Sequence, residues 1–192
     1  GVVQLVQGNK ETVDALIDHP LVSAVSFVGS TAVAKYIYGR ATANGKRAQC
    51  QGGAKNPIIV LPDADIEMTT QMAADSFYGC AGQRCLAGSV AIVVGDKGNE
   101  FKDAIIDLAR NRKVGYGWDE GIEMGPVISA ESKTRIENFI DLGAKEGAKI
   151  VVDGRGAKVS GYENGNFILP TVIDEVTPQG EIAKTEIFGP VL

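Results

Sequence analysis

Strand-like and helix-like segments alternate along almost the whole of this chain. Short runs rich in β-branched and apolar residues recur at residues 24–28, 46–51, 57–61, 89–94 and 149–152. Between these runs, apolar residues repeat at helical spacing over residues 12–18, 31–42, 66–78, 100–111 and 130–144. Strands that are separated by helices usually return to the same sheet in parallel. The sequence therefore predicts an α/β fold with a mainly parallel sheet.

Polar residues suited to end a helix stand at the boundaries of these segments. Asp65 and Ser129 each precede a helical pattern, and either side chain can accept a hydrogen bond from a first-turn N–H. Ser30 or Thr31 can do the same for the helix at residues 31–42, and Gly147 is a typical helix terminator. A glycine-rich loop at residues 154–166 then leads to a further extended segment, residues 167–176.

The composition excludes several classes of protein. Apolar residues make up 44% of the chain and charged residues 22%, with a formal net charge of −5, so intrinsic disorder is excluded. The longest apolar runs, residues 58–61 and 90–94, are far shorter than the roughly 20 residues that cross a bilayer. A mildly acidic chain without a block of Lys or Arg binds nucleic acid and anionic membranes poorly. We therefore expect neither a nucleic-acid nor a membrane partner.

The three cysteines are Cys50, Cys80 and Cys85, and His19 is the single histidine. An odd number of cysteines does not suit a closed disulfide framework. No pair has the spacing of a zinc knuckle, and a structural zinc site needs about four ligands. The sequence thus predicts no metal site, and the free thiols favour a reducing compartment.

Both ends of the sequence suggest a fragment. The chain opens with Gly-Val-Val-Gln, without a Met or a basic secretory region, and stops at Gly-Pro-Val-Leu in what resembles the start of a strand. Two glycines between two predicted strands, within residues 52–56, mark a candidate domain boundary.

The segment at residues 79–87 carries the most informative chemistry. Glycine and other small residues surround Cys85 just after a predicted helix, so a substrate and backbone amides can approach its sulfur closely. A cysteine thiolate is a strong nucleophile near neutral pH. The alternative is an inert, buried cysteine, which is the commoner situation for a free thiol. A Cys–His hydrolase is disfavoured because His19, before a turn, is the only available base.

Four motifs that are weak one by one together resemble the aldehyde dehydrogenase superfamily. Residues 82–85 (Gly-Gln-Arg-Cys) are similar to its nucleophile loop, and residues 52–57 (Gly-Gly-Ala-Lys-Asn-Pro) to the segment about 30 residues before that cysteine. Residues 186–191 (Glu-Ile-Phe-Gly-Pro-Val), about 100 residues after it, resemble the Glu-x-Phe-Gly-Pro motif. Residues 26–31 resemble the strand, turn and helix beneath the NAD pyrophosphate.

This resemblance implies a division of the chain into two functional parts. Residues 1–53 would be the C-terminal part of a Rossmann-type NAD-binding domain. Residues 54–192 would be most of the catalytic domain, incomplete at its C-terminus. The superfamily also implies a parent homodimer or homotetramer, located in the cytoplasm of a bacterium or the mitochondrial matrix of a eukaryote. The isolated fragment is expected to be inactive.

The resemblance assigns Cys85 as the nucleophile that attacks an aldehyde carbon. The backbone N–H of Cys85 would donate to the resulting oxyanion. Arg84 would bind a carboxylate on the substrate, since a guanidinium pairs well with that group.

The cofactor residues follow from the same resemblance. Ser30 and Gly29 would lie at the NAD pyrophosphate and Gly52 close to the cofactor. Glu186 would accept the hydroxyls of the nicotinamide ribose, and Phe188 would pack beside the nicotinamide. Simpler explanations remain open at this point: Ser30 as a plain N-cap, Glu186 as a solvated surface charge, and Phe188 as an ordinary core residue.

The subfamily is indicated by the residue four positions before Lys55. Hydrolytic members carry a glutamate there as general base, whereas this chain has Gln51, whose amide cannot accept a proton from water. Residues 53–56 and 161–167 are most similar to the CoA-acylating methylmalonate-semialdehyde dehydrogenase type. This implies oxidation of methylmalonate or malonate semialdehyde to propanoyl-CoA or acetyl-CoA, with NAD as cofactor and CoA as co-substrate. The alternatives are a hydrolytic NAD(P)-dependent aldehyde dehydrogenase and a non-catalytic folded remnant.

Overall fold

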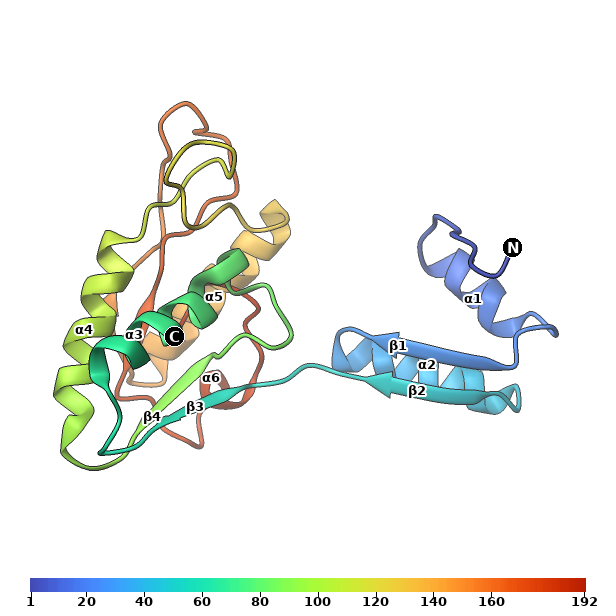
Figure 1. Cartoon of the computed structure of the whole chain (residues 1–192). Coiled ribbons are helices and arrows are strands. Elements are labelled where there is room, and N and C mark those ends of the chain that lie inside the picture. The colour runs from blue at the N-terminus through green and yellow to red at the C-terminus, as the bar shows by residue number, and fades with distance from the viewer. The chain divides into compact units, whose positions relative to one another are not determined.

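The computed structural model describes all residues from Gly1 to Leu192, and the chain forms two compact units (Figure 1). The first unit is Gly1–Gly53 and the second is Ala54–Leu192. Helices and short strands alternate in both units, so the predicted α/β fold is confirmed. None of the helices combines the length and the apolar character that crossing a membrane requires.

The first unit is a two-stranded parallel sheet with a helix packed on it. Its elements are α1 (Lys10–Asp18), β1 (Ala24–Val28), α2 (Thr31–Ala43) and β2 (Arg47–Gln51). The two strands pair in register from Ala24 opposite Arg47 to Val28 opposite Gln51. A small core forms where Ile17 of α1 and Ile37 of α2 meet the inward-facing side chains of the strands. Alternate strand residues face outward and stay exposed, the expected pattern for a sheet covered on one face.

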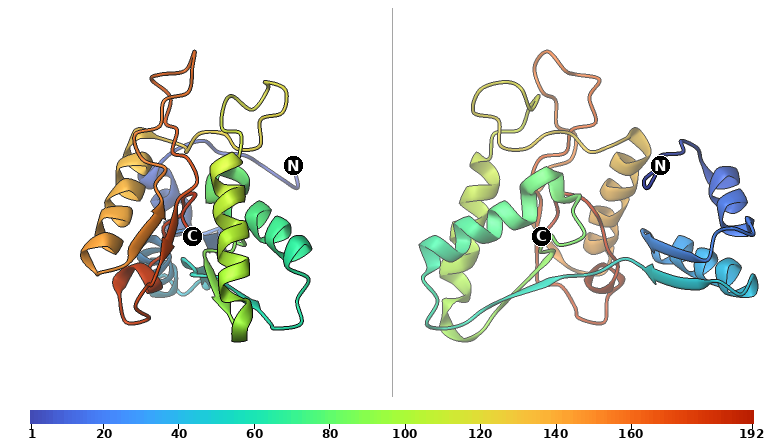
Figure 2. Two further views of the ribbon diagram at one scale, coloured as in Figure 1. Left: turned by 90° about the vertical axis from the view of Figure 1, so that its left-hand side faces the viewer. Right: turned by 45° about the vertical axis from the view of Figure 1, so that its right-hand side comes forward.

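The second unit holds the larger core and the remaining elements (Figure 2). The first of these, in chain order, are β3 (Pro57–Val60), α3 (Ile66–Tyr78), the 3₁₀ turn η1 (Gly79–Gly82), β4 (Val90–Val93) and the 3₁₀ turn η2 (Gly95–Lys97). They are followed by α4 (Gly98–Asn111), α5 (Ala130–Lys145), β5 (Lys149–Val152), β6 (Val172–Asp174) and α6 (Glu181–Lys184). Strands β3 and β4 are parallel, whereas β5 and β6 are antiparallel.

The antiparallel pair has a simple cause. A strand that pairs in parallel with the preceding one needs a crossover connection, usually a helix. The long connection between β5 and β6 contains no helix, and the two strands pair in antiparallel. The extended segment predicted at residues 167–176 contains only the short strand Val172–Asp174. Its backbone also receives support from the end of the chain, because Thr171 bridges in parallel to Val191.

Most of the residues predicted to begin or end a helix do so in the structure. Asp65 Oδ1 accepts a hydrogen bond from Met68 N at 3.0 Å, and Ser129 Oγ accepts one from Ser132 N at 3.1 Å, as predicted. Gly147 follows α5 with φ of 93°, the left-handed conformation expected of a helix terminator. Ser30 occupies the N-cap position of α2, but its side chain makes no capping hydrogen bond.

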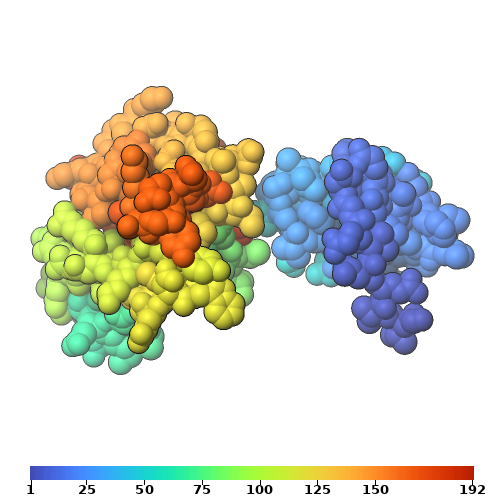
Figure 3. Space-filling view, turned by 90° about the horizontal axis from the view of Figure 1, so that it is seen from above, coloured from blue at the N-terminus to red at the C-terminus, as the bar shows by residue number.

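Two long loops pack against each other in the second unit, in yellow and orange in Figure 3. Tyr116 in the first stacks on Tyr162 in the second, with ring centroids 5.3 Å apart. Tyr162 also meets the ring of Phe167 at 6.5 Å. These aromatic contacts give the glycine-rich loop at residues 154–166 a fixed neighbour although it has no regular secondary structure.

Two segments about 100 residues apart in sequence meet through their backbones at Gly82 and Gly189. The chain turns after α3 through Cys80, Ala81 and Gly82, which have φ values of 52°, 53° and 68°. A Cβ atom on Gly82 would lie only 2.1 Å from the carbonyl oxygen of Gly189. Glycine is therefore required at position 82 both by its backbone conformation and by this contact.

We expect Gly82→Ala to lower the free energy of unfolding by about 2–4 kcal/mol, since the new methyl group is both clashing and strained. Urea unfolding of the 192-residue chain, followed by circular dichroism, measures the loss. Gly117→Ala is the matched control, because no atom lies within 4 Å of the Cβ position at Gly117. Equal stability of the two variants would contradict the prediction.

Candidate active site

In the first unit, four predicted cofactor or base residues lie together where β1 and β2 end. The strands are parallel, so their carboxyl ends are adjacent, which is where α/β folds usually bind ligands. Gly29 N donates to Gln51 O at 3.1 Å, and the next residues are Ser30 and Gly52. Gly52 allows α2 to approach closely, because a Cβ there would lie 2.7 Å from Thr31 Oγ1.

The N-terminus of α2 suits a negatively charged group. The Ser30 side chain does not cap the helix, and the first turn contains no acidic residue. By contrast, α3 and α5 both have a capping side chain and an acidic residue in the first turn. The first N–H groups of α2 thus have no side-chain acceptor, and helix N-termini favour anions. These residues fit the pyrophosphate of a dinucleotide.

Gln51 is the last residue of β2, and it is exposed. Its backbone carbonyl is used by Gly29, which leaves the side-chain amide at the strand end. An amide has no ionisable group, so this side chain cannot act as a general base at any ordinary pH.

In the second unit, the loop that carries Cys85 is anchored by its backbone while the residue itself is exposed. Asn56 Nδ2 donates to Cys85 O at 2.8 Å and to Ala87 O at 2.9 Å. On the other side of the turn, Gln83 Oε1 accepts a hydrogen bond from Ile128 N at 2.9 Å. The loop is therefore fixed from two directions, and the thiol is open to a substrate. Cys80 is also free and exposed, whereas Cys50 is half-buried.

Arg84 has a structural contact that the sequence did not predict. Its Nη2 donates to Asp75 O at 2.8 Å and to Ser76 O at 3.1 Å, near the C-terminus of α3. A cation there satisfies helix carbonyls and interacts favourably with the helix dipole. Gly79 makes room for the guanidinium, since a Cβ would lie 2.6 Å from Nη2. Nη1 and Nε keep their donors free, so binding of a substrate carboxylate remains a prediction.

Glu186 and Phe188 lie on a segment that reaches the Cys85 loop through the Gly82–Gly189 contact. Both side chains are half-buried. Phe188 has φ of 53°, a left-handed conformation that is rare for a bulky residue and is found more often at functional sites.

Two cations act on Glu186. Burial lowers the pKa of Lys55 to about 8, and the negative charge of Glu186 opposes that shift. Burial also lowers the pKa of Arg135, again opposed by Glu186.

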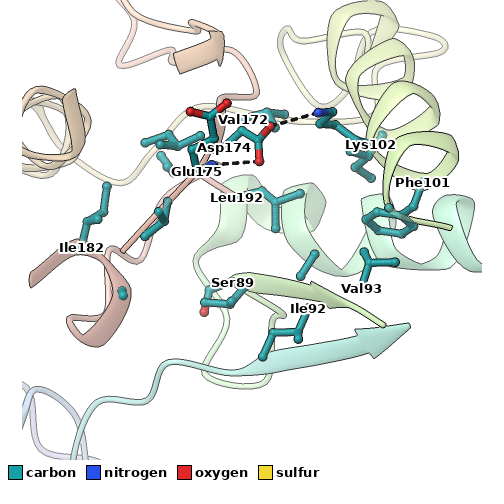
Figure 4. A pocket seen from close by; sticks show the side chains of 18 of the residues that line it. Ser89, Ile92, Val93, Phe101, Lys102, Val172, Asp174, Glu175, Ile182 and Leu192 are labelled. Atoms are coloured by element: carbon teal, nitrogen blue, oxygen red, sulfur yellow. Dashed lines mark hydrogen bonds and ion pairs between the residues drawn. The ribbon is translucent and has the colours of Figure 1, made fainter. Parts of the chain in front are cut away.

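Another cleft of the second unit lies elsewhere (Figure 4). It has a volume of about 670 Å³ and runs between β4 and β6, with walls that are mostly aliphatic. Lys102 and Asp174 form an ion pair of 3.2 Å at one side. Cys85 does not line it but lies in a separate, shallower hollow with Arg84 and Leu86. This cleft therefore does not contain Cys85, the predicted nucleophile. No group of His, Cys, Asp and Glu side chains is arranged to hold a metal ion.

Sequence reasoning missed Asn56 and Arg135 as residues that support the site. Asn56 belongs to the Gly-Gly-Ala-Lys-Asn-Pro segment, and its amide directly before β3 was the available signal. Arg135 lies on a helix 52 residues from its contact, and nothing in the local sequence distinguishes it from other cations.

Comparison with known proteins gives a consistent result. The sequence profile of the aldehyde dehydrogenase family matches residues 1–192. The probable acylating mitochondrial methylmalonate-semialdehyde/malonate-semialdehyde dehydrogenase of Anopheles gambiae is 50% identical over 192 residues, which are 100% of this chain and 37% of that protein. The malonate-semialdehyde dehydrogenase of Pseudomonas aeruginosa is 45% identical over 196 residues, covering 100% of this chain and 39% of that protein.

Among solved structures, a protein of Sinorhizobium meliloti assigned as a methylmalonate-semialdehyde dehydrogenase and complexed with NAD superposes with a TM-score of 0.93. It is 50% identical, and the match covers 96% of this chain and 38% of that one. The chain thus spans little more than a third of the relatives it matches. With a profile match over its whole length and these relatives, the chain belongs to the aldehyde dehydrogenase family and is similar to its methylmalonate-semialdehyde dehydrogenases.

Proposed function

We propose that this chain carries the nucleophile and part of the cofactor site of an NAD-dependent, CoA-acylating aldehyde dehydrogenase. Its substrates are methylmalonate semialdehyde and malonate semialdehyde, and its products are propanoyl-CoA and acetyl-CoA. The observation that carries this proposal is the exposed Gln51 at the end of β2, where hydrolytic members of the family have a carboxylate. The names of the relatives, which include acylating enzymes, support it.

Cys85 performs the first step in this proposal. Its sulfur attacks the aldehyde carbon, and the backbone N–H of Cys85 donates to the oxyanion that forms. Donors of this kind contribute about 3 kcal/mol in other enzymes. The hydrogen bonds from Asn56 to the carbonyls of Cys85 and Ala87 support the role by holding the loop backbone in one orientation.

NAD, when bound, accepts the hydride that leaves the thiohemiacetal carbon. The uncapped N-terminus of α2, at Ser30, would hold the pyrophosphate, and Gly29 and Gly52 would leave room beside it. Glu186 would accept hydroxyl groups of the nicotinamide ribose, because a carboxylate can receive two donors. Phe188 would pack on the nicotinamide side.

A thioacyl group then remains on Cys85, and the second step must break it. Gln51 cannot take a proton from water, so hydrolysis is slow. The thiol of CoA ionises in part without help, and its thiolate attacks the thioester carbonyl, which frees Cys85 and forms acyl-CoA. Exchange between a thiolate and a thioester therefore does not require the strong general base that activation of water requires.

The carbon count fixes a further requirement. Methylmalonate semialdehyde has four carbons and the propanoyl group three. The bond between the carboxylate and the α-carbon therefore breaks, CO₂ leaves, and a proton from solvent takes its place on that carbon. The free Nη1 and Nε donors of Arg84, beside Cys85, would bind this carboxylate before it leaves.

The domain roles belong to the same proposal. Residues 1–53 serve as the C-terminal part of the NAD-binding domain and residues 54–192 as most of the catalytic domain. A homodimeric or homotetrameric parent, cytoplasmic in a bacterium or in the mitochondrial matrix of a eukaryote, is proposed with them. Several of the relatives are named as mitochondrial. A hydrolytic enzyme and a non-catalytic remnant are the competing outcomes of the tests below.

Without CoA, the full-length enzyme should release a burst of about one equivalent of NADH per active site and then turn over slowly. The burst reports accumulation of the thioacyl-enzyme, and stopped-flow absorbance at the NADH band measures it. Added CoA should restore fast steady turnover. Desulfo-CoA, which lacks only the thiol, is the control and should not. Equal steady rates with and without CoA would favour the hydrolytic alternative.

Gln51→Glu should raise the CoA-independent rate, because a positioned base contributes roughly 100- to 10,000-fold. A grafted carboxylate seldom has ideal geometry, so we expect at least the lower end. Gln49→Glu is the matched control, since Gln49 is exposed on the same face of β2, two residues earlier. A similar effect of both substitutions would mean that added charge, and not a base at position 51, changes the rate.

The 192-residue chain alone should show no dehydrogenase turnover and at best weak NAD binding. It covers 37% of its Anopheles relative, and the resemblance places the adenine-binding strands and a second oxyanion donor upstream. Absorbance of NADH with malonate semialdehyde, NAD and CoA tests the chain. Sustained NADH formation by the purified chain would contradict both this expectation and the domain roles.

A further inference from the structure

Helix α5 holds the segment that carries Glu186 and Phe188 at two successive points. Arg135 Nη1 donates a hydrogen bond to Ile187 O at 2.5 Å, across 52 positions of sequence. The next residue, Ile136, packs closely against Gly189, since a Cβ atom added to Gly189 would lie 2.7 Å from the Ile136 side chain. The carbonyl that Arg135 binds belongs to the peptide between Ile187 and Phe188. The hydrogen bond therefore fixes the plane from which Phe188 projects, one residue beyond Glu186.

The charges agree with this geometry. Arg135 from α5 and Lys55 from the residues before β3 are the two cations that act on Glu186, and Glu186 is the one anion that acts on either of them. None of the three takes part in an ion pair, since all the ion pairs of the structure involve other residues. The Glu186 carboxylate is thus held near cations while its oxygens stay available to a ligand.

The geometry points to Arg135 as a positioning residue, which holds Glu186 and Phe188 in the orientation that receives the nicotinamide ribose. This inference rests on the proposed function, because it takes Glu186 as the acceptor of the ribose hydroxyls. Arg135 acts through its hydrogen bond to Ile187 O and through its positive charge near Glu186.

The Cys85 loop has anchors of its own, which makes the effect of Arg135 selective. Asn56 holds the carbonyl of Cys85, and Gln83 accepts a hydrogen bond from Ile128 N. Neither anchor involves Arg135. Loss of the Arg135 hydrogen bond should therefore disturb the 186–188 segment and leave the reactivity of Cys85 unchanged.

Arg135→Met in the full-length enzyme should weaken NADH binding roughly 10-fold, the range expected for a lost hydrogen bond from a charged donor. Fluorescence titration with NADH, without aldehyde or CoA, measures the dissociation constant. The KM for NAD should rise in parallel, with kcat and the KM for the aldehyde within about two-fold of the parent values. Arg135→Lys, which keeps a charged donor, should recover most of the affinity.

Lys133→Met is the matched control, because it removes a cation from the same helix that makes no hydrogen bond. It should leave NADH binding unchanged. Alkylation of Cys85 by iodoacetamide in the absence of NAD should proceed at the parent rate in every variant. If Arg135→Met does not fold, Arg135→Gln replaces it under the same criteria.

A double-variant cycle separates positioning from general loosening. When Glu186 is already replaced by Gln, adding Arg135→Met should cost clearly less than 10-fold in NADH affinity, because only Phe188 remains to be positioned. A full 10-fold loss in that background, unchanged affinity in Arg135→Met alone, or a parallel change in Cys85 alkylation would each overturn the inference. Since the NADH titrations and the alkylation of Cys85 contain no CoA, failure of this inference is distinguishable from failure of the CoA-acylating proposal.

Discussion

The packing of the second unit depends on one contact between two backbone segments, which are too close to admit a methyl group. Gly82 ends the turn after α3, and its Cα faces the carbonyl of Gly189 so closely that a methyl group would be 2.1 Å from it. Gly189 in turn lies against Ile136 of α5. Helix α3, the C-terminal segment and α5 are therefore connected through two glycines. Because packed interiors leave few voids, the positions of these three elements are constrained together at the two glycines.

This contact also explains why the proposed site residues come from distant parts of the sequence. Cys85 follows Gly82 by three positions, and Phe188 precedes Gly189 by one. The segment of Cys85 and the segment of Glu186 and Phe188 are thus brought together by a contact between two glycines. These glycines have no side chain and take no part in the proposed chemistry. The φ of 53° at Phe188 is the local consequence, since the chain must turn sharply to bring Gly189 against the turn. Such strain persists only where surrounding packing over-determines the conformation.

Sequence reasoning succeeded where the deciding interaction was local. Asp65 and Ser129 cap their helices because an N-cap bond spans only three residues, and the parallel pairing of β1 with β2 follows from the helix between them. It failed where the partner was remote. The antiparallel pairing of β6 depends on a helix-free loop and on support from Val191. Arg84 was predicted to bind substrate, and nothing local indicated that it also binds carbonyls near the C-terminus of α3.

The choice of the acyl acceptor can be argued from what the two units provide. The second unit offers an exposed thiol on an anchored loop, which is enough to form a thioester but does not by itself select what breaks it. The first unit offers, at the end of β2, an amide in place of an ionisable side chain. Water needs a base to become a competent nucleophile near neutral pH, whereas a thiol with a pKa a few units lower supplies its own anion. In the proposed mechanism, an amide in place of a carboxylate at position 51 would therefore move the resolution of the thioester from water to a thiol.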